Sequence, residues 1–361
     1  MQRIYNFAAG PSTLPLPILE EAQEKLLDFE ASGMSLIEMS HRSKIYDNVH
    51  NETITLAREI LKIPENYNIL FLQGGATLQF GMVPMAFLKE GTTADYILTG
   101  SWAKKAYADA EAVGKTNIVW DGGNEKYTRI PSQDELNFTK DAAYVHICSN
   151  ETIGGIQWQQ FPDTGKIPLV IDMSSDVMSR PLPWDKINMI YAGTQKNLSP
   201  AGMAFIVIKD SFAENARRDL PAYLRYDRHI EQNSLYNTPP SFVVWMMNLT
   251  LKWIKSIGGM PEIEKRRDEK ANIIYDQIDN SEGFYRNPVD KNSRSMMNVV
   301  WRLPSEDLEK EFLQEIENEG ISGLKGHRSV GGCRASIYNA MPVEGVKTLV
   351  SFMKDFMQKK G

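Results

Sequence analysis

The sequence predicts an α/β protein: a large domain built on a mostly parallel, seven-stranded sheet, and a smaller C-terminal α+β domain. Seven short β-rich runs lie between residues 68 and 208, and several are apolar on both faces, as in strands buried between two layers of helices. Stretches long enough for crossover helices separate some of these runs. Beyond about residue 255, amphipathic helical patterns alternate with single strand-like runs, which indicates a second domain.

The elements are expected in a definite order. A first helix carries apolar residues from Ile18 to Phe29 and stops near Gly33, and a second helix spans Ile45 to Ile60. The seven strands are expected at Asn68–Leu72, Tyr96–Thr99, Asn117–Trp120, Tyr144–Cys148, Leu169–Met173, Met189–Ala192 and Ala204–Ile208. The C-terminal part is expected to form a helix over Ile263–Ile278, a strand at Met297–Leu303, a helix over Leu308–Ile316, a strand at Arg334–Tyr338 and a helix over Val346–Met353.

The change of rhythm places the domain boundary near residue 257. We therefore assign residues 16–257 to the large domain and residues 258–361 to the small one. The first 15 residues are too short to fold alone, and we expect them to pack on one of the two domains, with the small domain as the candidate.

The composition excludes several classes of protein. With 42% hydrophobic residues the chain is able to bury a core, and its net charge of −6 without a basic run argues against nucleic-acid binding. The longest uncharged apolar run, about Ser241 to Leu251, is too short to cross a bilayer. Two cysteines make no disulfide framework, and the N-terminus lacks the apolar stretch of a signal peptide. We expect a cytoplasmic protein with no membrane partner.

Common catalytic and cofactor motifs are missing from the sequence. Gly114-Lys115-Thr116 resembles the end of a phosphate-binding P-loop, but Asp109 stands where that motif needs its first glycine. There is no Gly-x-Gly-x-x-Gly after the first strand, no Gly-x-Ser-x-Gly, and no histidine or cysteine pattern suited to a metal. No metal site is expected.

Four features stand at the carboxyl ends of predicted strands, where open α/β sheets bind ligands. Gln73–Thr77 leads through two glycines into a helix whose first N–H groups suit a phosphate. Trp102 begins another helix, where its ring is able to stack on a planar group. Asp172 ends an apolar strand, and Lys196 follows the next strand in a loop of small residues. Each feature alone has an ordinary structural explanation: a tight turn, a core tryptophan, a helix cap or magnesium ligand, and a surface charge.

Together, the four features match the needs of pyridoxal 5′-phosphate. A lysine bonds to its aldehyde carbon, an acid pairs with its ring nitrogen, an aromatic ring stacks on it, and a helix start takes its phosphate. The joint pattern is far more specific than any one of its members.

Motifs along nearly the whole chain resemble those of the phosphoserine aminotransferase family, class-V enzymes of fold type I that use pyridoxal phosphate. The matching segments are Asn6–Pro11, Ser40–Ser43, Gln73–Ala76, Thr99–Trp102, Ser149–Gly155, Gln195–Asn197, Tyr236–Pro240, Gly326–Arg328 and Gly331–Ala340. The resemblance implies a homodimer with shared active sites. It also implies amino transfer between O-phospho-L-serine plus 2-oxoglutarate and 3-phosphooxypyruvate plus L-glutamate, in L-serine biosynthesis. The family often handles 4-phosphooxy-L-threonine as well, in pyridoxine biosynthesis.

The resemblance also implies a role for each site residue. Lys196 bonds to the cofactor, Asp172 pairs with the ring nitrogen and Trp102 stacks on the ring. The remaining cofactor contacts fall on Gly75, Ala76, Thr77, Thr152 and Gln195, and on Asn237 and Thr238 contributed by the partner subunit. Arg334 suits the substrate α-carboxylate as a bidentate fork, and the cations for the phosphate or γ-carboxylate are His41, Arg42, His327 and Arg328.

One position departs from part of the family. Some relatives carry arginine directly after Gly-Gly-Ala, where this chain has Thr77. Backbone amides and a hydroxyl still suit the cofactor phosphate there, but any help from a cation toward the substrate charge is lost.

Two other functions compete with this interpretation. One is another fold-type-I enzyme, such as an alanine–glyoxylate type aminotransferase or a cysteine desulfurase. The desulfurase is disfavoured because it needs a mobile cysteine, and Cys148 falls inside a predicted strand. The other is a cofactor-free α/β binding protein, which would be colourless, whereas a pyridoxal-phosphate enzyme is yellow.

Overall fold

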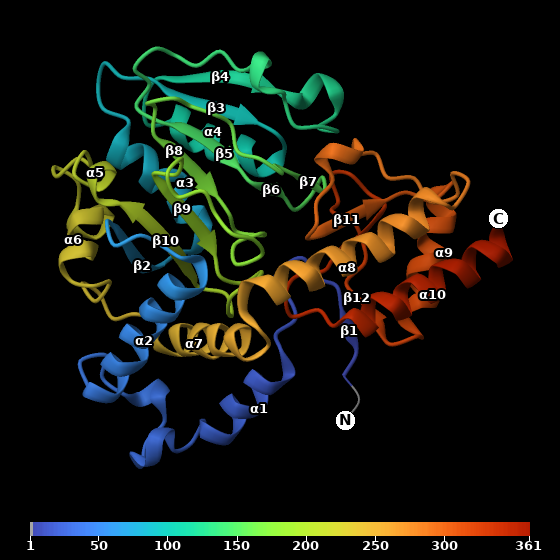
Figure 1. Cartoon of the computed structure of the whole chain (residues 1–361), viewed down its shortest axis with the longest axis horizontal. Coiled ribbons are helices and arrows are strands. Elements are labelled where there is room, and N and C mark those ends of the chain that lie inside the picture. The colour runs from blue at the N-terminus through green and yellow to red at the C-terminus, as the bar shows by residue number, and fades with distance from the viewer. Residues whose placement is uncertain (1–2) are drawn as a thin grey trace.

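The computed structural model describes residues 3–361 and is centred on one seven-stranded sheet (Figure 1). All seven predicted strands are confirmed, with ends that differ by a few residues. They are β2 (Tyr67–Gln73), β3 (Ala94–Leu98), β4 (Thr116–Asp121), β5 (Val145–Cys148), β8 (Leu169–Asp172), β9 (Met189–Gly193) and β10 (Met203–Lys209). The strand order is β2-β10-β9-β8-β5-β3-β4. Only β10 runs antiparallel to its neighbours, so the prediction of a mostly parallel sheet is confirmed.

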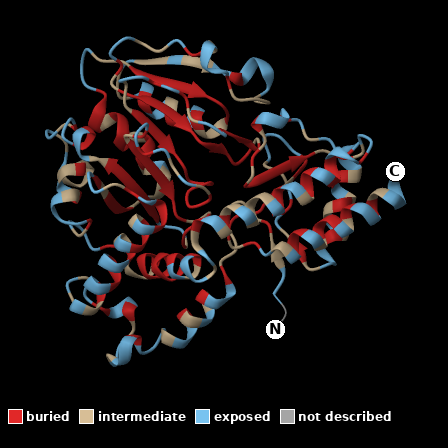
Figure 2. Cartoon of the chain, viewed as in Figure 1, coloured by how far each residue is buried: buried red, intermediate tan, exposed pale blue. Residues whose placement is uncertain are grey.

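Helices cover both faces of this sheet, and its strands are largely buried except for the edge strand β4, which is partly exposed (Figure 2). Successive strand residues alternate between two apolar cores, as Val170 and Ile171 on β8 do. One core is covered by α3 (Gly75–Phe87), α4 (Ser101–Glu111), α5 (Asp210–Ala213) and α6 (Tyr226–Glu231), and the other by α2 (Lys44–Leu61) and α7 (Ser241–Ser256). Burial on two sides explains why the predicted strands lack an apolar–polar alternation.

The first helix is shorter than predicted. Helix α1 spans Leu16–Lys25, and the apolar pattern beyond it belongs to a separate 3-10 turn at Phe29–Ala31. Glu30 and Ala31 there have φ values of 53° and 52°, which a right-handed helix does not tolerate. Phe29 is still buried, with its ring centroid 5.1 Å from that of Trp245, so the predicted apolar position is correct although the helix is not continuous.

The C-terminal part forms a third apolar core from the five predicted elements and one short strand, β12, that was not predicted. They are α8 (Gly259–Asp279), β11 (Asn298–Trp301), α9 (Glu306–Glu317), β12 (Ile321–Ser322), β13 (Cys333–Ser336) and α10 (Val343–Lys360). Strands β11 and β13 pair antiparallel. The N-terminal strand β1 (Tyr5–Asn6) pairs parallel with β12, and Phe7 is fully buried in the same core.

Helix α8 connects the two parts of the molecule. Its early residues Met260 and Ile263 belong to the core of the large sheet, whereas Ala271 and Ile274 belong to the C-terminal core. The turn before it joins α7 to α8 at Ile257 and Gly258. We keep residues 257 and 258 as the proposed domain boundary. None of the helices formed by residues 3–361 has the length and apolarity needed to cross a membrane.

Candidate active site

The carboxyl edge of the sheet brings together side chains from four separate segments of the chain. Lys196 follows β9, Asp172 ends β8, Trp102 lies in the first turn of α4, and Thr152 follows the short strand β6 (Asn150–Glu151). The Nζ atom of Lys196 donates a hydrogen bond of 2.7 Å to Oγ1 of Thr152 and lies 5.0 Å from the centroid of the Trp102 ring. Because β9, β8, β5 and β3 are neighbours in the sheet, residues far apart in the sequence meet here.

Asp172 is held in a fixed orientation by Ser174. Its Oδ1 atom accepts hydrogen bonds from the Ser174 amide (2.9 Å) and hydroxyl (2.6 Å). No hydrogen bond within residues 3–361 reaches the other oxygen, Oδ2. Burial raises the pKa of the Asp172 carboxyl, while the nearby Lys196 charge and the Ser174 hydrogen bonds oppose that rise. The arrangement leaves one carboxylate oxygen available for a cationic ligand atom.

Lys196 lies in a loop that is held by hydrogen bonds from two directions. The Ser12 amide donates 3.0 Å to the carbonyl of Gln195, and the Ser12 hydroxyl donates to the carbonyl of Lys196. On the other side, the Asn339 amide donates 2.9 Å to Oδ1 of Asn197. Burial lowers the pKa of the Lys196 ammonium group, and the Asp172 carboxylate opposes that change. A desolvated lysine in a fixed loop is suited to act as a nucleophile and a base.

A buried acid that sequence reasoning missed lies against Trp102. Glu151 accepts hydrogen bonds from the amides of Trp102 (3.0 Å) and Ala103 (2.8 Å), and its side chain is fully buried. Burial raises the pKa of the Glu151 carboxyl to about 7. The family motif Ser149–Gly155 contains Glu151 but predicts no role for the acid. The signal available was an acid at the end of an apolar run, the same signal that identified Asp172.

The predicted phosphate-binding turn has the expected form. Gly74 has a φ of 90°, in the left-handed region that favours glycine, and lets β2 turn directly into α3. No side chain within residues 3–361 caps the first turn of α3, so its N–H groups are left without a side-chain partner. Thr77 is exposed there, and the side-chain Nε2 atom of Gln73 donates 2.5 Å to the backbone carbonyl of Thr238. The segment that contains Thr238 therefore lies beside this turn in the same chain.

Three of the five predicted substrate cations lie near one another. Nη1 of Arg334, on β13, donates 3.3 Å to the Thr152 carbonyl, and its buried Nε atom has no partner within residues 3–361. The pKa of His327 is lowered by partial burial and by the charges of Arg334, Arg328 and Lys105. This cluster of positive charge faces the site from the C-terminal part of the chain, and it is suited to an anionic ligand.

The other two predicted cations are not brought to this cluster within one chain. His41 and Arg42 precede α2, and Arg42 is exposed. Neither side chain forms a hydrogen bond or ion pair with another residue of the described chain, 3–361. Asn237 and Thr238 are likewise exposed. Three predicted site residues, Arg42, Asn237 and Thr238, are therefore exposed on the surface of one chain.

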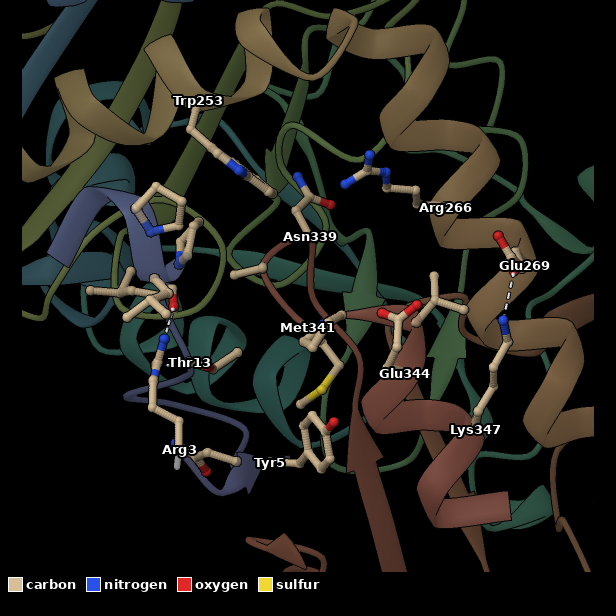
Figure 3. Close-up of a pocket in the computed structure, with 18 of the residues that line it drawn as sticks. Arg3, Tyr5, Thr13, Trp253, Arg266, Glu269, Asn339, Met341, Glu344 and Lys347 are labelled. Carbon is tan, nitrogen blue, oxygen red and sulfur yellow. Dashed lines mark hydrogen bonds and ion pairs between the residues drawn. The ribbon is translucent and has the colours of Figure 1, made fainter. Parts of the chain in front are cut away.

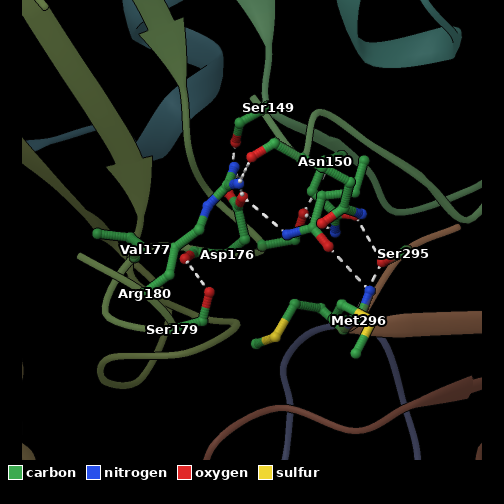
Figure 4. Close-up of polar contacts among 12 residues, drawn as sticks. Ser149, Asn150, Asp176, Val177, Ser179, Arg180, Ser295 and Met296 are labelled. Atoms are coloured by element: carbon green, nitrogen blue, oxygen red, sulfur yellow. Dashed lines mark hydrogen bonds and ion pairs between the residues drawn. The ribbon is translucent and has the colours of Figure 1, made fainter. Parts of the chain in front are cut away.

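A cavity of about 280 Å³ adjoins the Trp102 and Arg334 side of the site. Its walls come from the start of α4, the loop after β6 and the C-terminal part, and they include Gly100, Ile153 and Arg334. Beneath this wall, Asn150 donates 2.8 Å to Oδ1 of Asn298 and accepts 2.6 Å from the Ser295 hydroxyl (Figure 4). These buried hydrogen bonds join the two parts of the chain directly under the site.

A larger cavity of about 530 Å³ lies elsewhere, between the N-terminal segment, α8 and α10 (Figure 3). Its charges are of both signs and several are close together, as Lys347 and Glu269 are at 4.0 Å. None of the predicted site residues lines it in the part of the chain that the structure describes. The same residues, 3–361, contain no group of three or more histidine, cysteine, aspartate or glutamate side chains placed to hold a metal ion.

Fold and site together define an aminotransferase of class V, whose family model matches residues 4–349. A phosphoserine aminotransferase from Lysinibacillus sphaericus is 52% identical over 358 residues, 99% of each chain. The solved phosphoserine aminotransferase from Bacillus circulans subsp. alkalophilus superposes with a TM-score of 0.98 at 49% identity, covering both chains fully. A pyridoxal-phosphate-bound phosphoserine aminotransferase from Trichomonas vaginalis gives 0.93 at 39% identity, over 98% of this chain and 100% of that one. The chain belongs to the phosphoserine aminotransferase family.

Proposed function

We propose that this chain binds pyridoxal 5′-phosphate and transfers an amino group reversibly between O-phospho-L-serine plus 2-oxoglutarate and 3-phosphooxypyruvate plus L-glutamate. We place the reaction in cytoplasmic L-serine biosynthesis and extend it to 4-phosphooxy-L-threonine in pyridoxine biosynthesis. Similarity over the full length to phosphoserine aminotransferases supports the proposal. The observation that carries it is the buried Lys196 amine within 2.7 Å of Thr152, beside Trp102 and one strand from Asp172.

The residues present fit this cofactor. Oδ2 of Asp172 has no hydrogen-bond partner within residues 3–361 and suits the ring nitrogen, and Trp102 offers a ring face beside Lys196. The uncapped N–H groups of Gly75, Ala76 and Thr77 suit the phosphate. When bound, the cofactor withdraws electrons from the substrate Cα, which makes the Cα proton removable.

Lys196 and Asp172 have separate tasks in this mechanism. Lys196 would hold the cofactor, and its Nζ atom, when free, would accept the proton that leaves the substrate Cα. Nζ must be uncharged for this step, and burial, which lowers its pKa, favours that state. Asp172, ionised, keeps a proton on the ring nitrogen, and Ser174 holds the carboxylate in the required orientation.

The substrates require two cationic poles, because phosphoserine and glutamate each carry an α-carboxylate and a second anionic group. We assign the α-carboxylate to Arg334, whose Nε atom is buried without a partner in the described residues. His41, Arg42, His327 and Arg328 are assigned to the phosphate or γ-carboxylate. Thr77 adds no charge to this second pole.

A desulfurase reaction fits the site poorly. Cys148 is buried on β5, its Sγ atom donates to the Asn150 carbonyl at 3.4 Å, and burial raises the pKa of the thiol. A persulfide-forming cysteine must be reactive and mobile, and Cys148 is neither. Amino transfer is therefore the better assignment.

The proposed activity is tested with a panel of amino donors. We expect a yellow protein that forms glutamate from 2-oxoglutarate with O-phospho-L-serine and 4-phosphooxy-L-threonine, and far more slowly with alanine or unphosphorylated serine. Formation of product from alanine as readily as from phosphoserine would contradict the substrate assignment.

We further propose that the chain acts as a homodimer. Large apolar side chains are exposed around α1 and the loop after it, among them Leu27 at 84% and Ile37 at 57% exposure. Exposed apolar side chains concentrated in one segment are typical of a protein interface. His41 and Arg42 follow the same segment. In a dimer formed through this face, Asn237 and Thr238 of one chain serve the cofactor phosphate in the site of the other.

Mixing inactive chains tests the shared site. A Lys196→Ala chain combined with an Asn237→Ala/Thr238→Ala chain should regain activity, because each heterodimer then has one intact site. Random mixing yields about a quarter of the parent activity. In the matched control, Lys196→Ala mixed with Asp172→Asn, both lesions affect residues that each chain supplies to its own site, and no activity returns. No recovery in the first mixture, with heterodimers shown to form, would place Asn237 and Thr238 in their own chain's site.

Separate half-reactions distinguish the two cationic poles. Phosphate near neutral pH carries about −1.5 to −2 charges, so it gains more from each cation than a carboxylate does. Arg42→Gln should therefore lower kcat/KM for phosphoserine about tenfold more than for glutamate. Arg334→Gln should lower both equally, because both substrates present an α-carboxylate. The spectral change of the cofactor reports each half-reaction, and Lys44→Gln, two residues from Arg42 and also exposed, is the control for charge. If Arg42→Gln lowers kcat/KM equally for phosphoserine and glutamate, the assignment of Arg42 to the phosphate is contradicted.

A further inference from the structure

We propose that Glu151 is a positioning residue of the active site: from strand β6, its carboxylate holds the first turn of helix α4 and thereby fixes the Trp102 ring beside Lys196. The inference rests on the proposed role of Trp102 as the ring that stacks on the cofactor. It adds a residue to which the sequence motifs assigned no role.

The geometry is that of a helix cap supplied from another strand. Helix α4 has 11 residues, and its own N-cap residue, Gly100, offers no side chain to the free N–H groups. Glu151 fills this position with both oxygens: Oε2 accepts from the Trp102 amide at 3.0 Å, and Oε1 accepts from the Ala103 amide at 2.8 Å. A carboxylate at this end also interacts favourably with the helix dipole. The backbone of Trp102 is thus tied to Glu151 directly.

The space for this carboxylate depends on Gly100. A Cβ atom added to Gly100 would lie 2.5 Å from Cδ of Glu151 and 2.7 Å from Oε2, closer than nonbonded atoms approach. Glu151 is itself fully buried. The Glu151 carboxylate therefore fits against the helix start only because residue 100 has no side chain. This steric observation is independent of the hydrogen bonds.

Burial gives the cap a dependence on pH. The pKa of Glu151 is raised to about 7 by desolvation, while the two amide hydrogen bonds oppose the rise. The ionisable groups that face it are Asp172 on β8, Lys196 after β9, Cys148 on β5 and Tyr127 in the loop after β4. Asp172 raises the pKa further and Lys196 lowers it. Above pH 7 the ionised carboxylate accepts both hydrogen bonds at full strength, and below it the neutral acid accepts them more weakly.

The pH dependence of the Glu151 contribution to folding stability runs opposite to the pH dependence of its hold on Trp102. The ordinary pKa of the group is 4.5 and that in the folded chain is about 7, so the folded chain binds a proton more tightly. The contribution of Glu151 to folding is therefore present below pH 4.5 and is lost as the pH rises through 7. The ionised Glu151 carboxylate therefore orders Trp102 above pH 7, where Glu151 no longer contributes to folding stability.

The experiment follows the Trp102 signal in the full-length chain after the cofactor is removed. The indole fluorescence of Trp102 is obtained as the difference between the parent chain and a Trp102→Phe variant. We expect this difference to titrate with a midpoint near 7 in the parent and to become independent of pH in Glu151→Gln. In Lys196→Ala the titration should persist with a higher midpoint, because the Lys196 charge that lowers the pKa is gone. Glu111→Gln, at the exposed far end of the same helix, should behave as the parent.

A second measurement uses the chain loaded with cofactor. Glu151→Gln should weaken cofactor binding about tenfold, whereas Glu111→Gln should leave it unchanged. Should Glu151→Gln fail to fold, Gly100→Ala takes its place, because the added Cβ displaces the carboxylate while every side chain of the site remains. A folded Glu151→Gln or Gly100→Ala chain that keeps both the titration and the affinity of the parent overturns the proposal. If the parent chain itself catalyses no amino transfer, the proposed function is contradicted instead.

Discussion

Lys196→Ala is expected to abolish turnover, with a fall in kcat of at least about four orders of magnitude. The substitution removes an amine that lies beside the Trp102 ring and 2.7 Å from Oγ1 of Thr152. It thus takes away the covalent link to the cofactor and the base for the Cα proton together. Borohydride, which fixes the cofactor to the parent chain, should leave the variant unlabelled.

The matched control for this variant is Lys186→Ala, an exposed lysine just before the other end of strand β9. It should keep full activity and the borohydride adduct. Mass spectrometry of the reduced parent chain identifies the labelled peptide, and thermal unfolding confirms that the inactive variant is folded. An adduct on any lysine other than Lys196 would contradict the assignment of the nucleophile.

Asp172→Asn is expected to retain the cofactor but to slow removal of the Cα proton by about two to four orders of magnitude. The two side chains have the same shape, and an amide oxygen still accepts the hydrogen bonds that Ser174 donates at 2.9 and 2.6 Å. The amide carries no charge, so the proton on the ring nitrogen loses its electrostatic partner in a buried site where that partner matters most. The expected defect is therefore chemical and not structural.

Single-turnover kinetics with phosphoserine measure this step without product release. Asp185→Asn, an exposed aspartate in the loop before β9, is the control and should react at the parent rate. Cofactor content is measured on the same samples, because weak binding would mimic slow chemistry. A near-normal single-turnover rate in fully loaded Asp172→Asn would assign Asp172 a structural role only.

Much of the fold was predictable because its signals are local. The seven strands of the sheet are short apolar runs, and each is recognisable without knowledge of its neighbours. Lys196, Asp172 and Trp102 were identified for the same reason, since each directly follows or ends such a run, and the carboxyl ends of parallel strands meet at one edge. The error at α1 has a local cause as well: the positive φ values of Glu30 and Ala31 leave no mark in the apolar spacing.

The tertiary structure decided the contacts between residues that are far apart in the sequence and that no sequence pattern connects. Glu151 caps the helix of Trp102, 49 residues earlier, only because β6 follows β5, whose neighbour β3 leads into α4. Ser12 holds the carbonyls of Gln195 and Lys196 only because β1 pairs with β12 and brings the N-terminal segment across the molecule. The sequence by itself determined the strands and the chemistry at their ends, because apolar periodicity and residue type are local properties. The strand order and the packing of the C-terminal part against the large sheet determined which backbone groups and charges surround the reactive side chains. Those contacts exist only when distant segments are folded together.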